Sequence, residues 1–191
     1  MEREYRKDEK LEEAIIHPIT FAETYLRINN KPIILGDYQR AFLDDCLNYD
    51  KIVGIFSRQS GKSTCIAIYA LWHSLMHEYT KCLIISPTQE QSDLMFRKIK
   101  AFLNDNPELT KLIKRETATE LEFLNNSMIK SLPVGNEGKT IRGHTADLII
   151  LEESAFIKDV IVNQVIMPMA AAQQNPKIIQ ISTPFSKNHF Y

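Results

Sequence analysis

Short runs of continuously apolar residues, rich in side chains that favour strands, recur along the chain. They occupy residues 51–56, 81–86, 147–151 and 177–182. Between them, apolar side chains recur every three or four positions, as on one face of an amphipathic helix. These helical patterns extend over about residues 38–47, 64–75 and 88–103. Strands that are apolar throughout and alternate with helices predict an α/β fold whose mainly parallel sheet is covered on both faces.

Two segments depart from this alternation. Residues 120–134 hold two short apolar runs separated by Asn125-Asn126-Ser127, which predicts a β-hairpin. Residues 1–33 begin with a run of mixed charges and predict a charged leader followed by a short helix at about residues 19–28. The main domain is therefore expected to extend over residues 34–191.

The composition narrows the classes of function. Of 191 residues, 23 are Lys or Arg and 24 are Asp or Glu, so the net charge is −1. This balance excludes a polycation that coats nucleic acid, but it leaves room for a local basic patch. Three widely spaced cysteines lie in apolar stretches, which predicts reduced core thiols of a cytoplasmic protein and no zinc site. No apolar run approaches about 18 residues, so no membrane span is expected.

The strongest candidate for chemistry is the polar segment SRQSGKST at residues 57–64, between a predicted strand and a predicted helix. Gly61 would let the backbone turn around a phosphate, and the amides at the helix start would point at it. Lys62 would lie between the β- and γ-phosphates, and the Ser63 hydroxyl would reach Mg²⁺. The strict phosphate-loop pattern has a first glycine where this chain has Phe56. A helix that merely begins with these residues is the alternative.

Polar residues also end two of the other predicted strands. Glu152 and Glu153 directly follow the run at residues 147–151, where the carboxyl ends of parallel strands meet the phosphates. Glu152 is the candidate for holding Mg²⁺ through its water shell, and Glu153 for the base that polarises the attacking water. Ser182-Thr183-Pro184 ends the last strand and could sense the γ-phosphate. Solvated acids and an ordinary turn are the alternatives.

Taken together, the segments SRQSGKST, LIILEESAF and ISTPFSKNHFY resemble the ATPase domain of the large terminase subunit, the DNA-packaging motor of tailed bacteriophages. Members of that family often lack the first glycine of the loop and have Arg-Gln before the second, as here. An aromatic residue after the acid pair, here Phe156, and an Arg-Gly step before the acidic strand, here Arg142-Gly143, are also typical of it. The resemblance covers about residues 34–191.

The resemblance implies a RecA-like P-loop ATPase that uses ATP and Mg²⁺. The residues implied to bind ATP are Gln39, Ser57, Arg58, Gln59, Ser60, Gly61, Lys62, Ser63 and Thr64, with Gln39 reading the adenine edge. Ser63 and Glu152 would hold the metal, Glu153 would be the catalytic carboxylate, and Ser182, Thr183 and Pro184 would couple phosphate state to movement. Arg58 in cis, or Arg142 in cis or from a neighbouring subunit, would stabilise the transition state; a surface ion pair is the alternative for both.

The resemblance also implies partners: double-stranded DNA, the portal protein, the small terminase subunit and a homo-oligomeric ring, in the host cytoplasm at the procapsid portal. Large terminase subunits carry a nuclease domain after the motor, and this sequence stops before it. We expect a fragment or an interrupted reading frame, without nuclease activity and with weak ATP turnover. The competing functions are a helicase-like or repair ATPase and a nucleotide-binding assembly module without turnover.

Two smaller features remain. The stretch from Arg97 to Arg115 holds six basic and two acidic residues; it could contact DNA phosphates, although a solvated helix face is the simpler interpretation. His73 and His77 are one helical turn apart, but no third ligand is near them in the sequence. The flank of a helix is therefore a better interpretation of this pair than a metal site.

Overall fold

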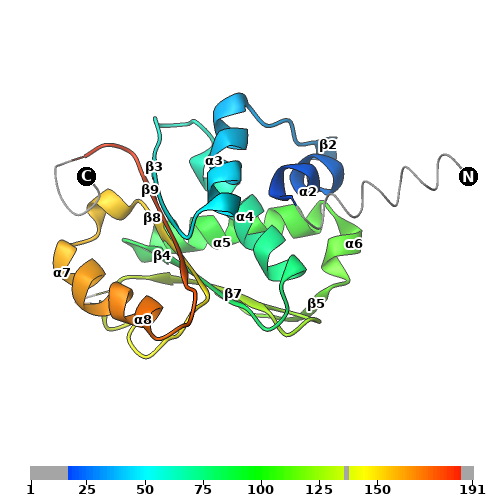
Figure 1. Ribbon diagram of the computed structural model, residues 1–191. Coiled ribbons are helices and arrows are strands. Elements are labelled where there is room, and N and C mark those ends of the chain that lie inside the picture. Colours follow the sequence, from blue (N-terminus) through cyan, green and yellow to red (C-terminus); the bar gives the residue numbers. More distant parts are fainter. Residues whose placement is uncertain (1–16, 136–137, 186–191) are drawn as a thin grey trace, which may run out of the picture.

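The computed structural model describes residues 17–135 and 138–185, and its centre is a seven-stranded sheet (Figure 1). Five neighbouring strands are parallel, and two antiparallel strands extend one edge. The parallel strands, in spatial order, are β3 (Lys51–Ile55), β9 (Lys177–Ser182), β8 (Leu148–Glu152), β4 (Lys81–Ser86) and β7 (Met128–Pro133). The antiparallel strands are β6 (Glu120–Phe123) and β5 (Ile113–Glu116). This arrangement confirms the predicted α/β fold.

Helices cover both faces of the sheet (Figure 1). The helices on the first face are α2 (Pro18–Tyr25), α3 (Asp37–Asn48), α4 (Lys62–Met76) and α5 (Gln89–Asn104). The segments on the second face are η2 (Ser154–Phe156), α7 (Asp159–Ile161), the π-helical η3 (Val162–Ile166) and α8 (Met167–Ala171). The remaining elements are β1 (Arg27–Ile28), β2 (Lys31–Pro32) and α6 (Pro107–Thr110).

Each face of the sheet has its own hydrophobic core. In β8, Leu148 and Ile150 belong to the core on the first face, whereas Ile149 and Leu151 belong to the core on the second. Because successive side chains of a strand point to opposite faces, a strand that is covered twice must be apolar at every position. The continuously apolar runs in the sequence therefore follow from the two layers of helices.

The ends of the elements agree with most of the sequence predictions. The hairpin forms between β6 and β7, and Thr88 caps α5 by accepting a hydrogen bond from the Gln91 amide at 3.3 Å. The N-terminal helix α2 ends at Tyr25, three residues before the expected end, and it packs into the same core as α3 and α4. The charged leader at residues 1–13 lies outside the described residues.

Two parts of the fold were not predicted. Strand β5 lies within the stretch that the sequence suggested was a basic helix face, and its pairing with β6 is antiparallel. The helical segment from α7 to α8 also went unpredicted, although Ile157, Ile161, Val162, Val165 and Ile166 have helical spacing and are buried on the second face. The three- to four-residue spacing of these apolar side chains is itself a pattern that predicts a helix.

Candidate active site

The segment between β3 and α4 forms a tight loop, as the sequence predicts. Gly61 has φ of +80°, a left-handed conformation that favours glycine, and it directly precedes the first residue of α4. A Cβ atom at Gly61 would also collide with the Gln39 side-chain amide. Gly61, Lys62 and Ser63 line a cleft at the start of α4. The amides at a helix start favour the binding of a phosphate.

Phe56, at the position of the missing glycine, belongs to the core. Its ring packs edge-on against Phe42, with ring centroids 5.1 Å apart, and its backbone amide donates to the Ser182 carbonyl at 3.0 Å. The side chain thus fastens the beginning of the loop to α3, and the backbone fastens it to β9. A glycine is not needed here because the tight turn lies further along, at Gly61.

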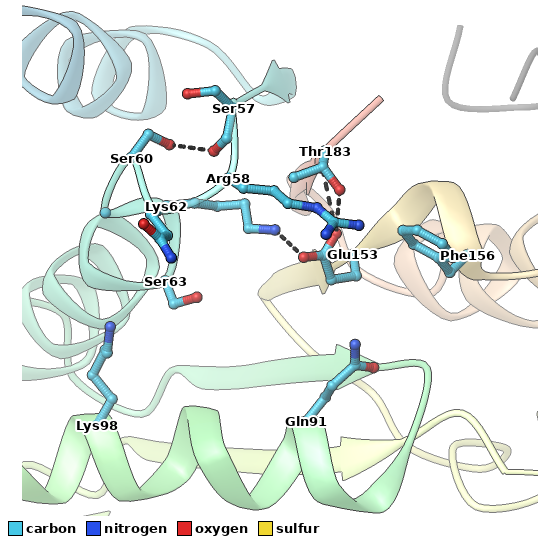
Figure 2. A pocket seen from close by; sticks show the side chains of 12 residues that line it. Ser57, Arg58, Ser60, Lys62, Ser63, Gln91, Lys98, Glu153, Phe156 and Thr183 are labelled. Atoms are coloured by element: carbon cyan, nitrogen blue, oxygen red, sulfur yellow. Dashed lines mark hydrogen bonds and ion pairs between the residues drawn. The ribbon is translucent and has the colours of Figure 1, made fainter. Parts of the chain in front are cut away.

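Lys62 and Glu153 meet across the cleft (Figure 2). Glu153 follows β8 with φ of +52°, a conformation that is unusual for a residue with a side chain and that is found preferentially at functional sites. Lys62 Nζ donates to Glu153 Oε1, and the Ser182 hydroxyl donates to Oε2 at 3.0 Å. The Thr183 amide and hydroxyl also donate to Oε2, at 3.3 and 3.4 Å. The structure therefore brings the predicted base, lysine and coupling residues together.

The electrostatics of Glu153 favour its charged form. Burial alone would raise its pKa, but the hydrogen bond and the positive charge of Lys62, with help from Thr183 and Ser182, outweigh burial and hold the pKa below its usual value. Glu153 is consequently ionised at neutral pH, as a group that accepts a proton must be.

Glu152 lies one residue earlier and has the opposite environment. It is buried, and it accepts hydrogen bonds from the Ser63 hydroxyl at 2.7 Å and the Ser86 hydroxyl at 3.3 Å. Burial raises its pKa, and the hydroxyl of Ser63 and the charge of Lys62 oppose that effect only in part. No cluster of three or more His, Cys, Asp or Glu side chains occurs in the described part of the chain. One carboxylate and one hydroxyl nevertheless suit Mg²⁺, which keeps several waters and uses substrate phosphates as ligands.

Lys62, Ser63, Glu153 and Thr183 line one cleft with a volume of about 450 Å³, which is within the usual range for small-molecule sites. Figure 2 shows the loop on one side of the cleft and α5 on the other. The lining residues are Ser57, Arg58, Gln59, Ser60, Gly61, Lys62, Ser63, Gln91, Lys98, Glu153, Phe156 and Thr183. The cleft thus contains most of the predicted loop residues together with the predicted catalytic carboxylate, Glu153, and one predicted coupling residue, Thr183.

Gln39 is held beneath the loop. Its Oε1 accepts from the Gly36 amide at 2.9 Å, and its Nε2 donates to the Ser60 carbonyl at 3.4 Å. The neighbouring Tyr38 hydroxyl donates to the same carbonyl at 2.8 Å. The start of α3 is therefore tied to the loop, and the predicted adenine-reading residue also supports the loop.

The two candidate arginines have different surroundings. Arg58 lines the cleft, and Figure 2 shows its side chain extending from the loop toward Glu153 and Thr183. Arg142 is exposed on the connection between β7 and β8, and its neighbour Ile141 packs on the second face of the sheet. Arg142 is not among the residues that line the cleft of its own chain.

Like Gln39, Glu152 and Ser182, the predicted residues Thr64 and Pro184 are close to the cleft without lining it. Thr64 accepts a hydrogen bond from Lys98 at 3.3 Å, and Pro184 is exposed after the coupling pair. The NHFY string at residues 188–191, which contributed to the resemblance, lies outside the described residues.

The stretch from Arg97 to Arg115 does not form a free basic surface. Glutamates neutralise many of its basic side chains, so the interpretation as a DNA-contacting helix face is not supported. The ion pairs are Lys100–Glu116, Lys111–Glu108, Lys114–Glu122 and Arg115–Glu120. Antiparallel pairing of β5 with β6 places Glu120 and Glu122 beside Lys114 and Arg115.

The histidines and cysteines behave as core and flank residues. His73 and His77 stack with ring centroids 4.6 Å apart, and burial lowers the pKa of His73 to about 3, so this ring is neutral. The three cysteines are free and buried, as expected, and burial raises the pKa of Cys65 to about 12. Among the described residues, none of the helices has the length and apolar character needed to cross a membrane.

Sequence reasoning missed three residues of the site. Ser86 ends β4 and donates to Glu152, and the rule that used the carboxyl ends of parallel strands would have found it. Gln91 and Lys98 reach the cleft from α5. Their spacing of seven residues places them on one helix face, but only the packing of α5 against the loop shows that this face meets the cleft.

The fold and the cleft together define a RecA-like P-loop domain, with the loop after strand β3 and two acids after β8. The sequence model of the family described as terminase large subunit, T4likevirus-type, N-terminal, matches residues 53–191, which is more than half of the chain. The chain therefore belongs to the large terminase subunit family.

Three relatives illustrate the similarity. The large terminase subunit of Thermus virus P23-45 is 26% identical over 162 residues, which cover 73% of this chain and 32% of that protein. The large terminase of bacteriophage HK97 matches with a TM-score of 0.79 and 23% identity, over 88% of this chain and 37% of that one. The large terminase of a thermophilic bacteriophage, solved in complex with ADP, matches with a TM-score of 0.58 and 16% identity, over 73% and 35%. The chain thus spans about a third of the length of these relatives.

Proposed function

We propose that this chain is the ATP-hydrolysing motor domain of a large terminase subunit and powers the movement of viral double-stranded DNA into procapsids. The observation that carries the proposal is the contact between Lys62 of the phosphate loop and Glu153, which Ser182 and Thr183 hold from the other side. Family membership and the relative that was solved in complex with ADP support a nucleotide as the ligand of this cleft.

Each residue of the cleft has a separate role in hydrolysis. The amides at the start of α4 and the Lys62 ammonium bind the phosphates. Ser63 and Glu152 would hold Mg²⁺, which would neutralise phosphate charge when bound. Glu153, kept ionised by its neighbours, orients the attacking water and accepts its proton. Arg58 extends over the same cleft and stabilises the charge that develops on the transferred phosphoryl group.

The pairing of Lys62 with Glu153 has a consequence for nucleotide binding. A phosphate must take over the Lys62 ammonium, and Glu153 then loses the strongest group that keeps it charged. Ser182 and Thr183 remain as its hydrogen-bond donors, and both lie at the end of β9. Nucleotide binding is thereby linked to the position of β9, which is the coupling role proposed for Ser182, Thr183 and Pro184.

We also propose binding partners for this chain. Double-stranded DNA, the portal protein and the small terminase subunit are the partners of a packaging motor, at the procapsid portal in the host cytoplasm. Arg142 lies outside the cleft of its own chain, so a catalytic contribution from it requires a neighbouring copy in a ring. The ion pairs in the stretch from Lys100 to Arg115 give no support for a DNA-gripping surface there.

Phosphate release by the purified chain tests the proposal, with and without DNA, for the wild type and for Lys62→Ala and Glu153→Gln. We expect Lys62→Ala to lose nucleotide binding and turnover, and Glu153→Gln to lose turnover by about 10²–10⁴-fold while it still binds ATP. Glu116→Gln, a change to an exposed ion pair far along the sheet, is the control and should keep wild-type turnover. Binding of nucleotide without turnover in any form would instead indicate an assembly module.

A further inference from the structure

Lys98 occupies the wall of the cleft opposite the phosphate loop. It projects from α5, lies half-buried, and lines the same cavity as Lys62, Ser63 and Glu153 (Figure 2). Its ammonium is 3.3 Å from the hydroxyl oxygen of Thr64 on α4. Lys98 is not among the residues with a proposed role in hydrolysis.

The partners of Lys98 differ from those of the basic residues around it. Lys100, two positions further along α5, pairs with Glu116, and Lys114 pairs with Glu122. Lys98 contacts only a neutral hydroxyl, and within residues 17–135 and 138–185 it forms no ion pair. An ammonium that lines a cleft and has no anionic partner is available to bind an anion that enters the cleft.

The two acids of the cleft do not supply the missing anion. Glu153 is bound by Lys62, Ser182 and Thr183. Glu152 is buried and accepts from Ser63 and Ser86. An anion that enters the cleft would therefore find Lys98 available, in addition to Lys62, which must first leave Glu153.

The position of Lys98 indicates which part of a nucleotide it meets. Tyr38 and Gln39 contact the loop at Ser60, on the side of α3, whereas Lys98 contacts Thr64 from α5. With the base expected on the α3 side, the triphosphate would extend along the loop toward Lys62 and Ser63, and Lys98 reaches from α5 toward Ser63 (Figure 2). We propose that Lys98 binds the terminal phosphate of the nucleoside triphosphate and so makes the cleft prefer triphosphate over diphosphate. This inference rests on the proposed nucleotide site.

Affinity measurements with two nucleotides test the proposal without relying on turnover. Mg-ATPγS and Mg-ADP are titrated calorimetrically into the wild-type chain and into Lys98→Met, Lys98→Arg and the control Lys100→Met. A hydrogen bond to a charged group contributes roughly 1.5–3 kcal/mol, so Lys98→Met should weaken ATPγS binding about tenfold or more. ADP affinity should stay at the wild-type value, Lys98→Arg should restore most of the loss, and Lys100→Met should bind both nucleotides normally.

Other outcomes would overturn the assignment. Equal losses for ATPγS and ADP, with a lowered unfolding midpoint, would mean that Lys98 only tethers α5 to Thr64. Unchanged affinity for both nucleotides, with loss of DNA-stimulated phosphate release, would assign Lys98 to the DNA backbone. If the wild type binds neither nucleotide, the proposed function itself fails, and the inference about Lys98 fails with it. If the wild type binds both and Lys98→Met changes nothing, only the inference fails.

Discussion

The cleft and the antiparallel edge of the sheet contain the same kinds of charged residues in opposite settings. In the cleft, the side chains of Lys62 and Glu153 are 10% and 20% exposed. At the antiparallel edge, the side chains of Lys114 and Glu122 are 47% and 27% exposed, and their charged atoms are 2.7 Å apart. Both pairs satisfy the geometry of a salt bridge, but only the first lies where a ligand can replace one partner.

Burial explains why substitutions in the two regions should have different effects. Water and salt screen exposed ion pairs, so such pairs contribute little to stability. Groups withdrawn from water interact more strongly with their neighbours. Burial therefore raises the pKa of Glu152, whereas the contacts of Glu153 outweigh its burial and lower its pKa. Changes in the cleft should therefore alter chemistry, whereas changes at the antiparallel edge should alter little.

After Lys62 and Glu153, the largest effect is expected at Arg58. Removing an arginine that stabilises the transition state costs about 10³-fold or more in rate, so Arg58→Ala should lower kcat by that amount in steady-state phosphate release. Arg142→Ala should lower turnover only at protein concentrations at which copies associate, because Arg142 is outside its own cleft. Arg115→Ala at the antiparallel edge is the matched control. Full activity of Arg58→Ala would show that this arginine is not catalytic.

A smaller effect is expected from Glu152→Gln. The amide oxygen can still accept from Ser63, and the Ser86 hydroxyl can turn to accept from the amide NH2, so the fold should survive, but the charge toward the metal is lost. Changes to groups that orient a metal typically cost about 10–100-fold in metal affinity. The Mg²⁺ concentration that half-saturates phosphate release should rise accordingly. The same half-saturation in wild type and variant would remove Glu152 from the metal site.

A substitution of Lys177 should have an effect of intermediate size, because this residue is partly buried but does not line the cleft. Its ammonium donates to the Cys46 and Tyr49 carbonyls at 2.6 Å and closes the end of α3. Lys177→Met should lower the free energy of unfolding by about 1–2 kcal/mol, because hydrogen bonds from a charged group are lost at a partly buried position. Urea unfolding measures this, with Lys51→Met on exposed β3 as the control. Equal unfolding midpoints for the two variants would contradict the capping role.

The smallest effect is expected at the antiparallel edge itself. Lys114→Ala should lower the free energy of unfolding by less than about 1 kcal/mol, as for other exposed pairs, and it should leave phosphate release unchanged. A double-mutant cycle with Glu122→Ala isolates the pair from the other contacts of each residue. A coupling free energy above about 2 kcal/mol would contradict the distinction between the two regions.

Local patterns made much of this molecule predictable. The loop at residues 57–64 is short and lies between a strand and a helix, and the acids Glu152 and Glu153 follow an apolar strand, so each was recognisable from its own neighbourhood. The parallel sheet followed from strands that are apolar at every position. The family resemblance joined these pieces, and the family match confirms it.

Features that depend on contacts between distant segments were not predictable in the same way. The left-handed backbone of Glu153 carries no sequence signal, because residues other than glycine rarely adopt it. The burial of Phe56 against Phe42 depends on how α3 packs. The difference between Lys98 and Lys100 depends on tertiary packing, because β5 supplies Glu116 to Lys100, whereas Lys98 faces the cleft.

Calorimetric titration of Mg-ATP into Glu153→Gln tests the central claim most directly. The claim is that Lys62 leaves Glu153 to bind phosphate while Glu153 acts only on the water. Removing the carboxylate charge frees Lys62 from its ion pair, so Glu153→Gln should bind Mg-ATP at least as tightly as the wild type and release phosphate about 10²–10⁴-fold more slowly. Loss of binding in Glu153→Gln, with the chain still folded, would contradict this account of the site.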